Sequence, residues 1–205
     1  MKKGITLLGA LAWFLMIASL SSIAVAETIE APSFNEGDFW KFSYKRASLG
    51  YRSDTPSDVT TIVFKNGKFV VNETTEAGTV GLVGLGAAVP GLREDLPWFQ
   101  FPLEPGKKWS GKIFNNKKWR YDNYRVEGKE TIEVPAGKFE TIKLVRERDA
   151  SGGSVTMYYY SPKTKSSVKA RTLQGGPRGD NTEIELLEYG NISQRDAVKI
   201  APPAQ

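Results

Sequence analysis

Short runs of β-forming residues, separated by turn signals, are the feature that most restricts the fold of this chain. Beyond residue 26, runs rich in Val, Ile, Thr, Tyr, Phe and Trp recur with no long helical pattern between them, which is typical of antiparallel strands. In one run, Trp40, Phe42 and Tyr44 alternate with polar residues. Since successive side chains of a strand point to opposite faces, this alternation predicts a strand with one buried face.

One turn signal stands out between two such runs. Asn66-Gly67 separates Val59–Lys65 from Lys68–Thr74. Both turn residues accept a positive φ, which the favoured two-residue hairpin turns require. The two runs are therefore predicted to form a β-hairpin.

Further β-type runs follow in the second half of the chain. Leu96–Pro105 is rich in proline and is predicted to be extended without forming a central strand, because proline cannot donate to the ladder. The remaining predicted strands are Lys108–Phe114, Lys117–Tyr124, Arg125–Val134, Lys138–Arg148, Ser154–Ser161, Ser167–Leu173 and Thr182–Tyr189.

These runs amount to roughly nine or ten strands in sequential order. Sequential neighbours usually pair, which predicts an antiparallel meander. A sheet with this many strands curls or folds into two layers. We therefore predict a single all-β domain over residues 27–190, either a β-sandwich or a half-open barrel, followed by a C-terminal tail over residues 191–205.

The N-terminus has the three parts of a secretory signal peptide. Lys2 and Lys3 provide a positive start, no charge occurs from Ile5 to Val25, and Ala24-Val25-Ala26 ends the stretch with small residues. An uncleaved anchor is the alternative, because about 20 apolar residues span a bilayer. The A-x-A site favours cleavage of residues 1–26 after Ala26 and export to the periplasm or the cell exterior.

Export lowers the charge of the working protein. The full chain has 28 Lys and Arg against 23 Asp and Glu, a formal charge of +5. Cleavage removes Lys2 and Lys3 and no acid, so about +3 remains. This small excess permits contact with anionic surfaces without requiring it.

Two residue types are absent from the chain. The lack of Cys excludes disulfides, thiol catalysis, zinc–thiolate sites and a lipid-modified N-terminal Cys. The lack of His removes the commonest general base, the usual metal ligand and the Ser-His-Asp mechanism. Only oxygen ligands remain, which would suit Ca²⁺, and the short acidic loops have no EF-hand-like ligand series. Neither a metal nor a cofactor is predicted.

A series of motifs runs through the second half of the chain. It has the form FPL..G..W, then VPAG.F, then YYSP…VK. This pattern resembles a widespread group of exported bacterial β domains of uncharacterised function, over about residues 100–170 of this chain. The motif residues are mainly turn and core types, so the resemblance implies a fold and no catalytic residue. They are Phe101-Pro102-Leu103, Gly106, Trp109, Val134-Pro135-Ala136-Gly137, Phe139, Tyr159-Tyr160-Ser161-Pro162 and Val168-Lys169.

A basic and aromatic stretch, Lys107–Arg125, is the first candidate binding site. Lys and Arg greatly outnumber acids in it, and Trp and Tyr are interleaved. Such mixtures can bind nucleic acid, but export argues against that partner and favours phosphorylated lipid head groups or acidic glycans. The alternative is a solvated hairpin whose charges block edge-to-edge pairing. The candidate residues are Trp109, Lys117, Lys118, Trp119, Arg120 and Tyr121.

Three consecutive tyrosines form a second candidate. Tyr158 and Tyr160 are predicted to share one strand face, with Tyr159 on the other. A tyrosine ring with its polar tip fits a groove wall or the margin of a core. Tyr158 and Tyr160 are therefore candidate binding residues, and a core position is the alternative.

Carboxylates are the third candidate, because glycoside hydrolysis needs only two well-spaced Asp or Glu side chains. Glu183 and Glu185 are predicted to share a strand face. Their alternation with apolar residues is equally typical of a half-buried strand with a solvated face. The full set of candidates is Glu127, Glu130, Glu133, Glu183, Glu185 and Glu188.

The segment Gly78–Leu92 is apolar and rich in glycine. It is too glycine-rich to predict a helix or a strand. It is either a mobile flap that touches a ligand or membrane, or a loop packed on the core.

Together these features favour a non-catalytic exported envelope protein rather than an enzyme. It would bind a hydrophobic or anionic envelope component, such as a lipid-like ligand, through a curved β-sheet. Two alternatives stay open: a carboxylate-dependent glycan hydrolase, and an assembly factor that binds another envelope protein at a sheet edge. The predicted partners are thus a lipid, an anionic glycan or an envelope protein, with peripheral membrane contact and no nucleic acid.

Overall fold

The computed structural model describes residues 28–47, 58–72, 75–76, 88–93, 97–115, 118–149, 153–174 and 181–193. The predicted signal peptide, the C-terminal tail beyond Ser193 and most of the glycine-rich segment lie outside these residues. The described residues form ten strands. Their bounds are β1 Asp38–Ala47, β2 Asp58–Lys65, β3 Lys68–Val71, β4 Thr75–Glu76, β5 Lys108–Asn115, β6 Lys118–Val134, β7 Gly137–Asp149, β8 Ser154–Ser161, β9 Ser166–Gln174 and β10 Asn181–Asn191.

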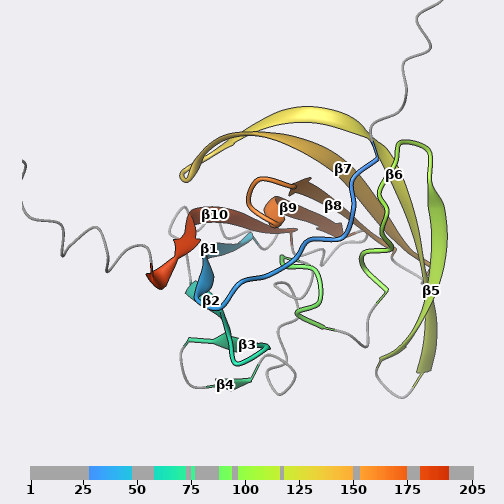
Figure 1. Cartoon of the computed structure of the whole chain (residues 1–205). Coiled ribbons are helices and arrows are strands. Elements are labelled where there is room, and N and C mark those ends of the chain that lie inside the picture. The colour runs from blue at the N-terminus through green and yellow to red at the C-terminus, as the bar shows by residue number, and fades with distance from the viewer. Residues whose placement is uncertain are drawn as a thin grey trace, which may run out of the picture.

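The strands form one antiparallel sheet in the order β4-β3-β2-β1-β10-β9-β8-β7-β6-β5. Two meanders, β1 to β4 and β5 to β10, meet where β1 pairs with β10, from Asp38 opposite Asn191 to Ala47 opposite Asn181. The sheet curls strongly without closing, because β4 and β5 stand at opposite ends of the strand order (Figure 1). The predicted all-β fold with antiparallel sequential pairing is confirmed, and of the two predicted forms the single curled sheet corresponds to the half-open barrel and not to the β-sandwich.

The predicted hairpin is present as β2 and β3. Lys65 pairs with Lys68 across the turn. Asn66 and Gly67 have φ angles of 52° and 73°, the left-handed conformation that a two-residue hairpin turn of this type demands at both positions. Local turn chemistry therefore sets the register of this pair.

The prediction of separate strands at Lys117–Tyr124 and Arg125–Val134 is wrong. One continuous strand, β6, runs through both. Tyr124 and Arg125 are consecutive, and neither is a typical turn-forming residue. The irregularity in this part of β6 is instead a register shift against β7 between Val126 and Gly128. A shift of this kind bends a strand without ending it, so β6 arches over the interior together with β7 (Figure 1).

The concave face of the sheet is filled by the chain itself. Trp40, Phe42 and Leu144 lie buried there and Tyr44 is partly buried against them, so the apolar face predicted for β1 is confirmed. The opposite face is not fully solvated as predicted, because Phe39 and Ser43 are buried as well. The segment before β1, blue in Figure 1, crosses this side of the sheet, and Ile29 exchanges backbone hydrogen bonds of 2.8 and 2.7 Å with Leu103. The indole N–H of Trp40 donates to the carbonyl of Thr164 at 2.6 Å. Because these segments occupy the hollow, its apolar surface is sealed from water.

Several residues of the FPL, VPAG and YYSP motifs serve this core and its turns. Leu103, Phe139 and Val168 are buried. Gly106 and Gly137 have φ angles of +88° and +127°, which a residue with a Cβ rarely adopts. These motif residues therefore belong to the core and to the turns of this sheet.

Candidate functional site

The outer, convex face of β5 and β6 carries a cluster of exposed rings around a lysine. Trp119 and Tyr121 are 59% and 53% exposed. The Lys112 ammonium lies 4.4 Å from the centre of the Trp119 ring and 6.0 Å from that of Tyr121. Lys112 stands directly opposite Tyr121 in the β5–β6 ladder, and Trp119 and Tyr121 are two residues apart, so all three side chains share one face. We call these three residues the aromatic–lysine cluster.

A shallow pocket of about 400 Å³ lies further along the same two strands. Ser110 opposes Asn123 and Lys108 opposes Arg125, so the polar side chains of its lining point to the outer face. The Ser110 hydroxyl donates to the Asn123 side-chain carbonyl at 2.7 Å. The lining as a whole comprises Lys108, Trp109, Ser110, Asn123, Tyr124, Arg125 and Glu147.

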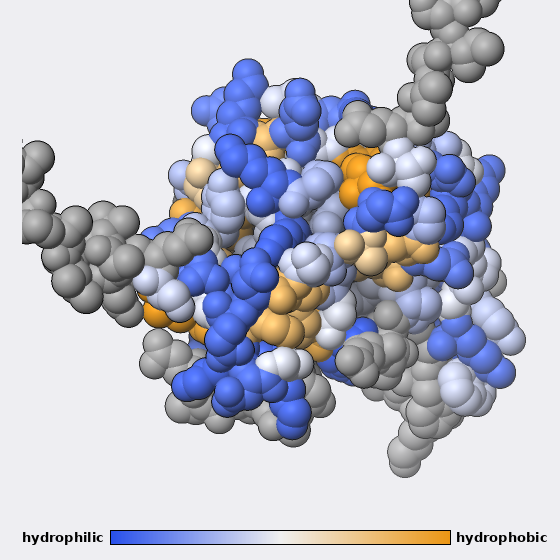
Figure 2. Space-filling model, viewed as in Figure 1, coloured by the Kyte–Doolittle hydropathy of each residue, from blue (hydrophilic) through white to orange (hydrophobic). Residues whose placement is uncertain are grey.

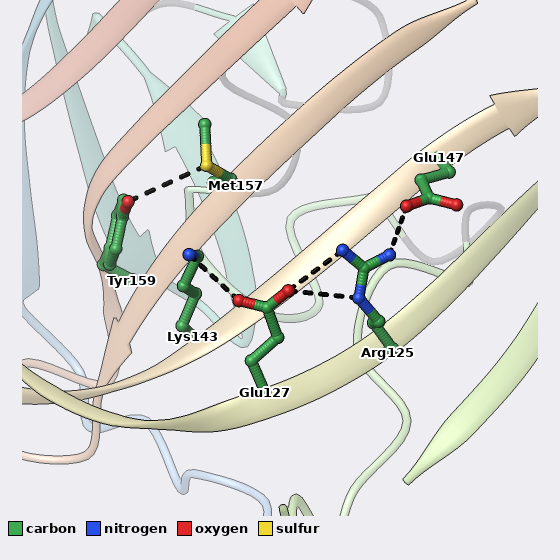
Figure 3. A network of polar contacts seen from close by, with 6 residues as sticks. All are labelled: Arg125, Glu127, Lys143, Glu147, Met157 and Tyr159. Atoms are coloured by element: carbon green, nitrogen blue, oxygen red, sulfur yellow. Dashed lines mark hydrogen bonds and ion pairs between the residues drawn. The ribbon is translucent and has the colours of Figure 1, made fainter. Parts of the chain in front are cut away.

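An ion-pair ladder borders this pocket on β6 and β7 (Figure 3). Arg125 donates to Glu147 and, at 2.9 Å, to Glu127, and Lys143 lies 2.9 Å from the other Glu127 oxygen. The hydrogen bond from Lys143 holds the pKa of Glu127 below its ordinary value, and the bond to Glu147 raises the pKa of Arg125. The charged forms of Arg125, Glu127 and Lys143 are therefore each favoured by their partners in the ladder, and Glu147 accepts a hydrogen bond from Arg125.

The ladder continues across β9, β10 and β1. Lys169 lies 2.8 Å from Glu185 and 3.4 Å from Glu183, and Lys45 lies 3.5 Å from Glu185. Burial by itself would raise the pKa of Glu185. The hydrogen bonds and positive charges of Lys169 and Lys45 have the larger combined effect, so the pKa of Glu185 lies below its ordinary value. Glycoside hydrolysis needs a carboxylic acid with a raised pKa, and neither Glu127 nor Glu185 has one.

The opposite, inner face of β6 holds a buried charge cluster. Asp122 is fully buried and accepts hydrogen bonds from Arg148 at 2.9 and 3.1 Å. Arg146 Nε lies 3.7 Å from the same carboxylate, and its Nη2 donates to Thr156 at 2.8 Å. Two guanidinium groups thus share one carboxylate. Arg146 Nε and the neighbouring Tyr124 hydroxyl have no hydrogen-bond partner but are sealed from solvent, so a ligand reaches neither.

The structure separates the candidates of the basic and aromatic stretch. Trp119 and Tyr121 lie on the outer face, whereas Trp109 is half-buried, stacks on Tyr124 at 5.2 Å and donates to the Pro97 carbonyl. Arg120, between the two exposed rings in sequence, belongs to the other face of the strand. Lys117 and the side chain of Lys118 lie outside the described residues.

The two candidate tyrosines of β8 lie in the core. Tyr158 and Tyr160 are 4% and 1% exposed. Phe99 packs against both rings, and Phe101 meets Tyr160 edge-on at 5.6 Å. Burial raises the pKa of both hydroxyl groups above the ordinary value. The alternative position that the sequence offered, inside the core, is where the structure places them.

Sequence reasoning missed the polar part of the outer face. Lys112, Ser110 and Asn123 lie within the candidate stretch Lys107–Arg125 but were not singled out, although strand alternation on both sides of the β5–β6 turn places them on the same face as Trp119 and Tyr121. Aligning the two strands across their turn would have found them. Within the ranges described above, no three carboxylates come together as a metal site, and no helix there is long and apolar enough to cross a membrane.

The fold and the outer face define an open, curled all-β chain with a polar convex surface. No family model and no curated protein matches its sequence. Among solved structures it is similar to a Bacteroides fragilis protein described as exported and YmcC-like in fold, at 12% identity and a TM-score of 0.39, over 80% of this chain and 100% of that one.

Two further solved structures are similar to this chain to about the same extent. The Escherichia coli protein YmcC, described as a lipoprotein, matches at 13% identity and a TM-score of 0.38, over 75% of this chain and 86% of that one. A Parabacteroides distasonis protein described as a lipoprotein matches at 13% identity and a TM-score of 0.38, over 80% of this chain and 100% of that one. None of these descriptions names a ligand or a reaction.

Proposed function

We propose that this chain is an exported, non-catalytic protein of the cell envelope that binds an anionic envelope component through the outer face of β5 and β6. The observation that carries the proposal is the aromatic–lysine cluster: an exposed ammonium flanked by two exposed rings. Two exposed rings grouped around one ammonium offer apolar faces and a positive charge side by side, which suits an anionic ligand that also has an apolar side.

The charge pattern of this face supports an anionic ligand. The described ion pairs neutralise Arg125 and Lys143 against Glu127 and Glu147. Lys108 and Lys112 take part in no ion pair among the described side chains, so a local positive excess remains beside the rings. Such an excess attracts anions, and salt weakens the attraction.

The concave face is a poorer place for the ligand. Phe99 and Phe101 cover Tyr158 and Tyr160, and Ile29 and Leu103 bridge the hollow. A lipid-like ligand held inside would have to displace these side chains from the core. The outer face needs no such rearrangement.

The two alternatives have less support. For hydrolysis, Glu127, Glu183 and Glu185 are engaged in ion pairs with lysine or arginine, which suits a solvated sheet surface better than proton transfer. For assembly by strand addition, β5 is an edge in the described sheet order, but Lys108 and Lys112 place charges on it, and edge charges oppose strand pairing.

The test is binding of the exported protein, without residues 1–26, to two anionic probes: phosphatidylglycerol vesicles and oligogalacturonate. We expect at least one probe to bind at low ionic strength and to weaken as salt rises. Exchanging both Lys108→Gln and Lys112→Gln should reduce that binding about tenfold or more, whereas Lys138→Gln, an exposed lysine of β7, should not. Absence of binding to both probes, or binding indifferent to the double exchange, would overturn the proposal.

A further inference from the structure

We infer that the pocket beside the aromatic–lysine cluster binds an acidic saccharide, with the sugar in the pocket and on the rings and its acid group beside the lysines. This inference rests on the proposed function and names its ligand class. Three features of the described side chains carry it: the chemistry of the pocket lining, the placement of the exposed rings, and the distribution of charge.

The pocket lining is chemically mixed in the way that sugar hydroxyls require. Each hydroxyl of a sugar both donates and accepts hydrogen bonds, so its site needs both kinds of partner. Ser110 supplies a hydroxyl, Glu147 a carboxylate and Arg125 a guanidinium. The Asn123 side-chain oxygen accepts from Ser110, which leaves its amide N–H₂ to donate outward. The volume of about 400 Å³ falls at the lower end of ligand sites, roughly 300–1,000 Å³.

The exposed rings continue the pocket in the direction of the β5–β6 turn. Tyr121 precedes the pocket residue Asn123 by two positions on the same face of β6, and Trp119 precedes Tyr121 by two more. Successive rings therefore stand about 7 Å apart along the strand. Sugar rings have apolar C–H faces that pack on aromatic faces, so units of a chain that starts in the pocket would pass over Tyr121 and Trp119.

The charge distribution selects an acidic sugar over a neutral one. Arg125 is engaged by both Glu127 and Glu147, so it orients these carboxylates and has little charge to offer. Lys112 and Lys108 lie four residues apart on the same face of β5, with Lys112 beside the rings and Lys108 at the pocket. A carboxylate or phosphate on the saccharide would meet an ammonium at either position.

A lipid fits this site less well than a saccharide. No aliphatic side chain lines the pocket, and its two aromatic members, Trp109 and Tyr124, are stacked on each other at 5.2 Å. An acyl chain needs aliphatic or aromatic walls, whereas the five other lining residues each carry a charged, hydroxyl or amide group that would lose water without gaining a partner from the chain. Lipid head groups could still meet the lysines, so vesicle binding is treated as a separate outcome.

The experiment titrates the exported protein with trigalacturonate, with the matched neutral galactose trimer and with phosphatidylglycerol vesicles, followed by calorimetry and tryptophan fluorescence. We expect trigalacturonate to bind at least tenfold more tightly than the neutral trimer. Asn123→Ala and Trp119→Ala should each weaken trigalacturonate binding about tenfold, and Trp119→Ala should also remove most of the fluorescence change. Leu173→Ala, which truncates an exposed apolar residue of β9, is the matched control and should change neither.

The outcomes separate this inference from the proposed function. Trigalacturonate binding that depends on Asn123 and Trp119 supports both. Vesicle binding without trigalacturonate binding overturns the saccharide inference and leaves the proposed function standing. Equal binding of the acidic and neutral trimers overturns the role of the lysines and refutes the proposal of an anionic ligand. Circular dichroism of each variant shows whether the sheet is intact, so a folding failure is not counted as lost binding.

Discussion

Replacing Asp122 by asparagine removes the carboxylate that two buried arginines share. Asp122 is fully buried, and the side chains of Arg148 and Arg146 are only 23% and 11% exposed. Removing one partner of a buried pair typically costs about 3–5 kcal/mol, because the remaining charge stays buried without compensation. Arg148 retains some access to water, so we expect the low end, about 3 kcal/mol.

A loss of this size is easy to measure. For a domain of 150–250 residues, about 3 kcal/mol lowers Tm by about 6–12 °C. Urea unfolding followed by tryptophan fluorescence gives the free energy directly. Glu127→Gln is the matched control, since its ion pairs with Arg125 and Lys143 lie at the surface and exposed pairs contribute about 0–1 kcal/mol. If Asp122→Asn cost no more than Glu127→Gln, the claim that this buried cluster holds β6 to β7 would be refuted.

Three further predictions concern packing, pH and processing. A Cβ on Gly111 would collide with the Pro97 ring, so Gly111→Ala should lower the unfolding free energy by about 1–3 kcal/mol, and an unchanged urea midpoint would contradict this. Burial tends to raise the pKa of Asp38, but bonds from Lys165, the Asn35 amide and Asn191 leave it below its ordinary value. Its contribution to stability is therefore present above about pH 4, the unfolded pKa, and is lost as pH falls through the lower folded pKa. The stability difference between the native chain and Asp38→Asn should thus stay constant above about pH 4 and shrink as pH falls below it, and a difference that stayed constant at lower pH would argue against the bonds. Mass spectrometry of the exported protein should give the mass of the chain from Glu27 onward, whereas retention of residues 1–26 would point to an anchor.

The parts of the fold that follow local rules could be predicted from the sequence. The hairpin at Asn66-Gly67 depends on two residues that accept positive φ. The buried face of β1 follows from the period of two in Trp40, Phe42 and Tyr44. These features depend only on the conformational preferences of residues close together in the chain, so they can be predicted from the sequence alone.

The continuity of β6 was less visible. Turn signals normally mark strand ends, and the sequence predicts two strands, Lys117–Tyr124 and Arg125–Val134, where the structure has one. The actual irregularity, near Gly128, is a register shift that depends on the pairing with β7. A bulge of this kind is decided by the partner strand, which a single-sequence pattern does not include.

The candidate site was predicted in part. The interleaved basic and aromatic residues indicated the β5–β6 hairpin as a candidate, and Trp119 and Tyr121 lie on its outer face as exposed rings. The same pattern could not separate them from Trp109, whose ring stacks on Tyr124. Exposure depends on what packs against each face, and the segment that holds Trp109 through Pro97 is not part of the hairpin.

The sequence by itself determined the strand-rich composition, the turn chemistry and the absence of Cys and His, because each is a property of single residues or of near neighbours. Only the tertiary structure decided that β1 pairs with β10, that Asp122 is buried under two arginines and that Lys112 meets Trp119 across a hairpin. These three results join residues that are far apart in the chain or that lie on different strands. Their energies come from burial and from charge at short range, which exist only once the sheet has curled and brought those groups together.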